Sequence, residues 1–178
     1  MRVVRITADR IGVLIGKSGE TKRMLQKVTG LPIKVSKDGT VTIDDEKTDD
    51  PLMALKLVEV VKAIGRGFNP ENALRLLDDD EYLEIIDLKE CVADKQMNRV
   101  RGRLIGRDGK TKKIIEDLTL CEMIVYGNTV GLIGNSISLP VAKHAVEMII
   151  NGSEHSSVYS YLEGQRPRLR ISEMGFDL

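Results

Sequence analysis

Two short glycine turns, each flanked by basic residues, are the part of this sequence whose residue types could bind a ligand. The first glycine turn reads Gly16-Lys17-Ser18-Gly19 and the second reads Gly106-Arg107-Asp108-Gly109. Because glycine has no Cβ atom, a phosphate chain can approach the backbone of such a turn closely. A helix that starts at the last glycine would also present free N–H groups and the positive end of its dipole. The two turns therefore predict a site for a sugar-phosphate backbone.

The two glycine turns lie in an internal repeat. Residues 14–23 and 104–113 share Leu-Ile-Gly, a basic residue, a further glycine and Thr-Lys, at an offset of 90 residues. At the same offset, Thr29 matches Thr119. A repeat of this kind predicts two copies of one small fold, and a chain of 178 residues suits two small domains.

The apolar periodicity predicts the order β-α-α-β-β-α in each copy. In the first copy we expect strands at 3–7, 31–36 and 41–43, and helices at 11–15, after Gly19 and from Pro51. In the second copy we expect strands at 82–88, 121–126 and 129–133, and helices at 94–105, up to Thr119 and at 138–151. Asp38-Gly39 and Gly127-Asn128 are signals for the hairpin turns. The predicted fold class is therefore α+β, with two three-stranded antiparallel sheets covered by helices.

These elements predict a domain organisation. The two copies are expected at residues 1–67 and 81–151. Residues 68–80 are expected to form an acidic helical linker, in which Asp78 to Glu81 is solvated. Residues 152–178 are expected to form a polar C-terminal extension, whose end at Arg166 to Arg170 is a candidate for flexibility.

The charges are balanced overall but sorted along the chain. The 27 Lys and Arg residues equal the 27 Asp and Glu residues, which excludes a uniformly basic nucleic-acid coat protein. However, residues 10–27 hold five basic side chains against one acidic one, and residues 95–113 hold eight against one. The acidic side chains gather instead at 44–50 and 71–90. Because both basic runs centre on the glycine turns, they favour a polyanion site there.

A G-x-x-G turn between two helices is the backbone clamp of the KH module, which holds about four nucleotides of single-stranded RNA. Aromatic residues make up only 3% of the chain, so we expect base contacts from an aliphatic groove rather than from stacking rings. The expected groove residues are Leu14, Ile15, Met24 and Ile33, and Leu104, Ile105, Ile114 and Ile124. The predicted RNA-binding residues are Arg10, Leu14, Ile15, Gly16, Lys17, Ser18, Gly19, Lys22 and Arg23, and Arg101, Arg103, Leu104, Ile105, Gly106, Arg107, Asp108, Gly109, Lys110, Lys112 and Lys113.

Enzymatic alternatives find less support in the residues. The segment 12–18 resembles a phosphate-binding P-loop, but that motif needs four residues between its glycines and this chain has three. Neither His144 nor His155 lies near a Ser or Cys nucleophile motif. Cys91 and Cys121 have no metal-ligand spacing and are expected to be buried, reduced thiols in a reducing cytosol. We therefore predict no catalytic residue, metal or cofactor, with a P-loop enzyme and a protein-interaction scaffold as the alternatives.

The paired motifs resemble type I KH domains. The sequence at 66–74, 102–112 and 157–159 is similar to the two-KH small-subunit pre-rRNA processing factors of archaea, the counterparts of the eukaryotic partner-of-Nob assembly factor. The resemblance covers about residues 1–165. It implies a non-enzymatic protein that binds single-stranded RNA in the 3′ region of 16S rRNA during ribosome maturation. The rRNA 3′-end endonuclease and translation initiation factor two are its implied candidate partners.

The two glycine turns also bear on which branch of that family the chain resembles. Eukaryotic members lack an intact G-x-x-G in their first KH domain, whereas this chain keeps Gly16 and Gly19. The resemblance thus points to the archaeal branch, with two potentially active domains. Asp108 departs from a purely basic turn, although Arg107 and Lys110 flank it. No apolar run approaches the roughly 20 residues that span a bilayer, and the apolar start is too short for a signal peptide, so we expect a cytoplasmic protein.

Overall fold

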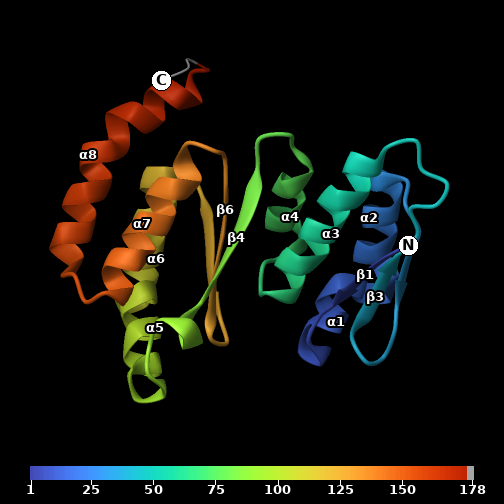
Figure 1. The fold of residues 1–178 in the computed structure, drawn as a ribbon, viewed down its shortest axis with the longest axis horizontal. Helices are drawn as coiled ribbons and strands as arrows, with labels where there is room; N and C mark the ends of the chain where they lie inside the picture. Colours follow the sequence, from blue (N-terminus) through green and yellow to red (C-terminus); the bar gives the residue numbers. More distant parts are fainter. Residues whose placement is uncertain (176–178) are drawn as a thin grey trace. The chain divides into compact units, whose positions relative to one another are not determined.

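The computed structural model describes residues 1–175 and shows two compact units, Met1–Asp79 and the chain from Asp80 onward (Figure 1). Each unit contains a three-stranded antiparallel sheet and a set of helices, so the α+β class predicted from the sequence is confirmed. Among the described residues, no helix is both long enough and apolar enough to cross a membrane.

The first unit follows the predicted order. Its elements are β1 (Arg2–Arg5), α1 (Ala8–Ile15), η1 (Lys17–Gly19), α2 (Glu20–Thr29), β2 (Ile33–Val35), β3 (Thr40–Ile43), α3 (Pro51–Gly65), α4 (Pro70–Ala73) and η2 (Leu74–Leu77). The strand order is β1-β3-β2, with Val4 opposite Val41 in the register and both side chains buried. On α3, residues such as Leu57 and Ile64 are fully buried, so this helix closes the core.

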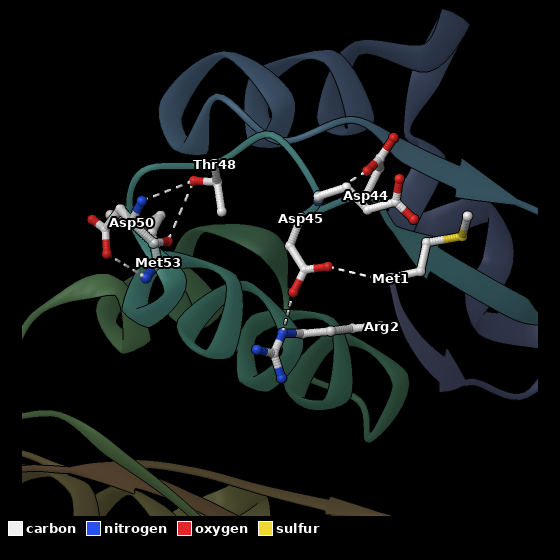
Figure 2. A network of polar contacts seen from close by, with 8 residues as sticks. Met1, Arg2, Asp44, Asp45, Thr48, Asp50 and Met53 are labelled. Atoms are coloured by element: carbon white, nitrogen blue, oxygen red, sulfur yellow. Dashed lines mark hydrogen bonds and ion pairs between the residues drawn. The ribbon is translucent and has the colours of Figure 1, made fainter.

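Local sequence explains where α3 begins. Pro51 occupies its first turn, where the missing N–H leaves no helical hydrogen bond unmade. The side chain of Asp50 accepts a hydrogen bond from the backbone N–H of Met53 at 3.0 Å and so caps the helix (Figure 2).

The acidic loop before α3 is held by the chain's first residues. The α-amino group of Met1 lies 2.7 Å from one carboxylate oxygen of Asp45, and Nε of Arg2 lies 2.8 Å from the other (Figure 2). The hydrogen bond with the amine lowers the pKa of Asp45 and raises the pKa of the amine. One of the acids gathered at 44–50 is therefore committed to contacts inside the first unit.

The second unit repeats this order with additions. Its elements are β4 (Tyr82–Asp87), η3 (Leu88–Glu90), η4 (Asp94–Gln96), α5 (Met97–Ile105), η5 (Arg107–Gly109), α6 (Lys110–Thr119), β5 (Glu122–Tyr126), β6 (Thr129–Gly134), α7 (Ser138–Ile150) and α8 (His155–Glu173). The strand order β4-β6-β5 matches that of the first unit. The segment 88–96 has no counterpart in the first unit, where only Ile6 and Thr7 separate β1 from α1.

The chain that follows the last helix of each repeat folds back onto that helix. Residues 68–80, expected as a linker, form α4 and η2, which pack on α3 with Ala73 and Leu76 buried. Residues 155–173 form α8, which packs on α6 and α7 with Val158 and Leu162 fully buried (Figure 1). Arg166 to Arg170, suggested as a flexible end, lie within this helix, and Leu169 among them is 6% exposed because the apolar side chains of the polar segment share the helix face that packs on the core. The last three residues of the expected extension, 176–178, lie outside the described residues.

The two cysteines differ from each other. Cys121 is 2% exposed and belongs to the core of the second unit, as expected. Cys91 is exposed, so its predicted burial is wrong. It directly follows η3, where Leu88 is fully buried instead, and its Sγ lies 3.6 Å from the carbonyl oxygen of Asp87.

The packing of α8 can be tested by stability. Leu162→Ala should lower the free energy of unfolding by about 2–5 kcal/mol, because it removes a fully buried side chain. Ser160→Ala, on the exposed side of the same helix, should leave it within about 0.5 kcal/mol. Urea denaturation followed by circular dichroism measures both, and equal, negligible effects would show that α8 does not pack on its unit.

Candidate nucleic-acid interface

The two glycine turns adopt the same backbone conformation. Gly16 and Gly106 have φ, ψ of 77°, 174° and 79°, 171°, and the final glycines Gly19 and Gly109 are left-handed at φ 79° and 76°. The third residue of each turn is left-handed as well, with φ 54° in both. A left-handed non-glycine residue is uncommon, and aspartate is among the types that tolerate it best. The acid at position 108 therefore suits the backbone that the second turn requires.

The two glycines of each turn have different roles. A Cβ atom at Gly16 would lie 2.8 Å from the amide nitrogen of Thr21, and one at Gly106 would lie 2.6 Å from that of Thr111. At Gly19 and at the matching glycine of the second turn, a Cβ atom would meet nothing within 4 Å. The first glycine is thus needed for packing inside the unit, and only the second faces space that a ligand could enter.

The helices that follow the turns start without side-chain caps. Both α2 and α6 have a left-handed glycine at the N-cap position and no side-chain hydrogen bond to their first turn. No side chain covers this end of either helix, and the N–H groups of Glu20 and Lys110 donate to the carbonyls of Lys17 and Arg107 within the turns. The exposed side chains of Lys17 and Arg107 stand in the two turns, and Lys110 and Lys113 are exposed on α6. This arrangement can accept an anionic chain at the positive end of each helix dipole.

Two of the predicted RNA-binding arginines have structural contacts within their unit. Arg10 donates to the carbonyl oxygens of Ile64 and Phe68, both at 2.8 Å, and burial lowers the pKa of its guanidinium. Arg103 donates to the carbonyls of Ile149, at 3.0 Å, and of Ser153. In each unit, the helix before the glycine turn thus carries an arginine that bonds to two carbonyl groups. One carbonyl belongs to the end of the last repeat helix, and the other belongs to the chain just beyond it, which folds back onto that helix. The sequence did not predict these carbonyl contacts, which only the tertiary structure shows, and the RNA contact of both arginines stays a prediction.

Part of the expected aliphatic groove is core. Leu14 and Leu104 are fully buried and Ile33 is 2% exposed, so none of them can line an accessible groove, and this expectation is wrong for them. An apolar residue at helical spacing looks the same in sequence whether it faces a core or a ligand. The remaining expected groove residues are half-buried: Ile15, Met24, Ile105, Ile114 and Ile124.

The other predicted basic residues lie along the helices that bracket the turns. Lys22 is half-buried and Arg23 exposed on α2, and Arg101 is half-buried on α5. Lys112 is partly committed, because its Nζ lies 3.7 Å from a carboxylate oxygen of Glu116. The structure therefore places Lys22, Arg23, Arg101 and Lys112 on the helices that flank the turns. Of these four side chains, Lys112 forms an ion pair with a residue of its own helix.

Sequence reasoning missed two equivalent side chains, Gln26 in the first unit and Glu116 in the second. Each one joins the second helix of its repeat to the edge strand of its sheet. The amide oxygen of Gln26 accepts from the N–H of Ile33 at 2.8 Å, and a carboxylate oxygen of Glu116 accepts from the N–H of Met123 at 3.2 Å. Both pairs obey the 90-residue offset, which was the signal that could have found them. Burial, with the neighbouring Glu122 adding to it, raises the pKa of Glu116.

Contacts from α8 support the second turn and have no counterpart in the first unit. The hydroxyls of Thr111 and Tyr159 are 2.9 Å apart, which ties α8 to the first turn of α6. Nε2 of His155 lies 2.9 Å from the carbonyl oxygen of Arg103, near the end of α5. Thr111 is only 1% exposed, so the second turn is backed by an additional layer of structure.

Comparison with known proteins agrees with this geometry. Residues 82–167 match the family model described as the eukaryotic type KH-domain, KH-domain type I. The chain is 42% identical, over 96% of its length and 76% of the relative's, to a KH domain-containing protein of Methanocaldococcus jannaschii. This chain belongs to the KH-domain proteins related to archaeal Dim2p and eukaryotic PNO1.

Two further members of this Dim2p and PNO1 family have informative names. The Dim2p chain in a crystal structure of an a/eIF2α–aDim2p–rRNA complex from Pyrococcus horikoshii is 47% identical, covers 94% of each chain and has a TM-score of 0.88. The pre-rRNA-processing protein PNO1 of Phaeosphaeria nodorum is 30% identical over 83% of this chain and 54% of its own. The chain thus spans about half the length of this eukaryotic relative.

The different roles of the two glycines predict different costs of substitution. Gly109→Ala should lower the free energy of unfolding by about 1–2 kcal/mol, the strain of a left-handed alanine. Gly106→Ala should lose about 1–3 kcal/mol more, because its methyl group also collides with Thr111. Urea denaturation of both variants measures the difference, and equal losses would contradict the assignment.

The raised pKa of Glu116 predicts a pH dependence of stability. The unfolded carboxyl ionises at its ordinary pKa of 4.5, whereas the folded one ionises at higher pH. Ionisation therefore favours unfolding, and this contribution makes stability fall as pH rises from below 4.5 through the raised pKa. Glu116→Gln keeps an acceptor for the N–H of Met123 and should flatten that fall and be more stable at pH 7.

Urea denaturation of Glu116→Gln at a series of pH values between about 4 and 7 tests this expectation. Glu90→Gln, at an exposed site on η3, is the control and should follow the parent protein at every pH. If the free energy of unfolding of Glu116→Gln changes with pH as that of the parent protein does, ionisation of Glu116 does not destabilise the fold.

Proposed function

We propose that this protein binds single-stranded RNA through its two glycine turns and acts without catalysis, and that its target is the 3′ region of 16S rRNA during ribosome maturation. One observation carries the proposal. In each turn, a glycine with open space beside its α-carbon precedes a helix N-terminus that no side chain caps, and a basic side chain stands in the same turn. A glycine with open space around it, a helix dipole and a nearby cation together suit a phosphodiester chain.

The relatives support the proposed class of target. A family member from Pyrococcus horikoshii crystallised in a complex with rRNA and a/eIF2α, and eukaryotic relatives are named pre-rRNA-processing proteins. We take the same two partners, rRNA and the α subunit of initiation factor two, as those of this chain. The rRNA 3′-end endonuclease is a further proposed partner, and the proposed location is the cytoplasm, where small-subunit precursors and both proteins would meet.

The proposed domain organisation follows from the repeat and differs from the boundaries expected from sequence. Each unit is a KH domain extended by its fold-back segment, α4 with η2 in the first and α8 in the second. Both glycine turns have the same backbone shape, which supports RNA contact by both. Asp108 reduces the positive charge of the second turn, which leaves Arg107 and Lys110 as its proposed phosphate contacts.

RNA binding is tested by charge removal at the turns. Lys17→Ala and Arg107→Ala should each weaken binding to a 16S 3′-end oligonucleotide and reduce the slope of log K against log salt by about 0.7, the value for one phosphate contact on a single strand. Fluorescence anisotropy at several salt concentrations measures both effects. These substitutions test RNA contact without disturbing the fold, whereas the side chain of Gly106→Asp would collide with Thr111 inside the fold.

Exposed lysines away from the turns provide the controls. Lys47→Ala in the first unit and Lys89→Ala in the second should leave affinity and salt slope unchanged. If both turn variants bind like the parent protein, the turns are not the RNA site. If they lose RNA but keep a/eIF2α, the protein surface for that partner is separate from the turns. If they keep both RNA and a/eIF2α, the result would favour the alternative, a protein-interaction scaffold that does not use the turns.

A further inference from the structure

A cavity of about 480 Å³ lies within the second unit, apart from the glycine turn. Its lining comes from three places in the sequence: the segment 88–96, the helix α5, and the end of α7 with the chain that follows it. Residues 106–109 of the glycine turn do not line it. Pockets that hold small molecules have volumes of roughly 300–1,000 Å³. The cavity is therefore large enough for a ligand group that the glycine turn does not hold.

The segment 88–96, which the first unit lacks, forms one wall of this cavity. Four of its residues line the cavity, namely Cys91, Val92, Ala93 and Gln96. Leu88 anchors the segment, because its side chain is fully buried and its N–H donates to the carbonyl oxygen of Asn128 at 2.8 Å. The N–H groups of Cys91 and Val92 donate in turn to the carbonyl oxygen of Leu88, at 3.1 and 2.8 Å. The fold thus holds this wall in place without a ligand.

Part of the lining is apolar. Val100 and Ile149 are core residues, 8% and 0% exposed, and both border the cavity. Val92 and Ile150 are half-buried and border it as well. Covering such surface removes apolar atoms from water, which favours binding. The lining therefore suits a ligand with an apolar face better than it suits a simple ion.

Two arginines on successive turns of α5 also line the cavity. Arg99 is exposed and Arg103 is half-buried. The guanidinium of Arg103 donates to two carbonyl groups, which hold it in place without cancelling its charge. Glu154 lines the cavity too, so two guanidinium groups against one carboxylate leave the lining positive. Arginine binds phosphate through paired N–H groups and stacks its plane on aromatic rings.

The first unit has neither this wall nor this charge. At the 90-residue offset, the position of Arg99 is occupied by Asp9, which is also exposed. Only Ile6 and Thr7 connect β1 to α1, so nothing in that unit corresponds to the segment 88–96. The features that favour an anionic ligand with an apolar face are therefore additions of the second unit and not part of the repeated fold.

We propose that this cavity binds a nucleotide, with its phosphate on Arg99 and its base against Ile150 and the guanidinium of Arg103. Unstacked bases bind to proteins by stacking on arginine planes, and arginine also binds their phosphates. The inference goes beyond the proposed function, because it concerns residues outside the glycine turns.

Two sources offer the chemistry of a nucleotide. One is a free mononucleotide, and the other is a nucleotide of an RNA strand held at the second glycine turn. Arg99 lies about 10 Å along α5 from Gly106, at a rise of 1.5 Å per residue. A strand held at the turn therefore needs to extend only a short distance to reach the cavity.

Cys91 provides the readout, because it is exposed and lines the cavity, whereas Cys121 is 2% exposed. The rate of Cys91 alkylation by iodoacetamide is measured on the full chain by mass spectrometry. Adenosine or uridine 5′-monophosphate, titrated to saturation, should slow it at least about threefold, which is the effect of a ligand at twice its Kd. Adenosine and inorganic phosphate should each protect less, because each lacks half of the ligand.

Arg99→Ala removes the proposed phosphate contact at an exposed site. It should raise the Kd for the monophosphates about tenfold, when each rate is compared with that variant's own rate without ligand. The matched control is Lys95→Ala, which removes the same charge from an exposed residue of η4 that does not line the cavity. This control should keep the protection of the parent protein.

A 16S 3′-end oligonucleotide distinguishes the two sources. If a nucleotide of the bound strand enters the cavity, the oligonucleotide protects Cys91, and Arg107→Ala removes that protection at the same RNA concentration. If the ligand is a free mononucleotide, the monophosphates protect Cys91 equally in Arg107→Ala and the oligonucleotide does not protect it.

Four results would overturn the inference. They are no protection by the monophosphates or the oligonucleotide, unchanged protection in Arg99→Ala, equal protection by inorganic phosphate, and protection by a/eIF2α alone, which would make the cavity a protein contact. These results leave the RNA site of the turns standing if Arg107→Ala weakens RNA binding. Conversely, unaltered RNA binding by Arg107→Ala refutes the RNA site, while protection by monophosphates still supports the cavity.

Discussion

In both units, the amide of a threonine at the start of a helix lies against the α-carbon of the first glycine of the turn before it. Any side chain at Gly16 or Gly106 would occupy the place of that threonine. The close contact restricts the angle between the helices on either side of the turn, and so it restricts where the second glycine and the first turn of the next helix point. The chemistry proposed for the turns depends on this packing contact, which involves no ligand.

A second constraint holds the rest of each repeat around this turn. Arg10 and Arg103 belong to the helices that end in the turns, and each binds two carbonyl groups where the last repeat helix stops and the chain reverses. The carbonyls of Ile64 and Ile149 lie in the last turn of their helices and accept from the N–H groups of Gly67 and Gly152 just beyond. The arginine adds a second donor there and also bonds to a carbonyl of the reversal, so it stabilises both the helix end and the reversal. The structural repeat therefore includes the fold-back segment, which is short in the first unit and 19 residues long in the second.

The two units have the same scaffold but different surroundings for their glycine turns. The second unit adds the segment 88–96, the support of α8 behind Thr111, an acid at position 108, and Glu116 beside Glu122 at the edge of β5. The first unit has Ser18, Gln26 and a half-buried Thr21 in the matching positions. The two units therefore present the same turn geometry with different charges around it.

The amino-acid sequence by itself determined the repeat, the order of elements and the location of the two turns. These features depend on local signals: glycine spacing, apolar periodicity and the Asp-Pro start of α3. Only the tertiary structure decided which of the predicted binding residues are buried and which bond to other parts of the chain. Leu14 and Leu104 are core, Arg10 and Arg103 bind carbonyls 46 to 58 residues away, and Cys91 is exposed. The physical reason is that a side chain's partner depends on distant parts of the chain that the fold brings together, while its residue type and spacing are the same in either role.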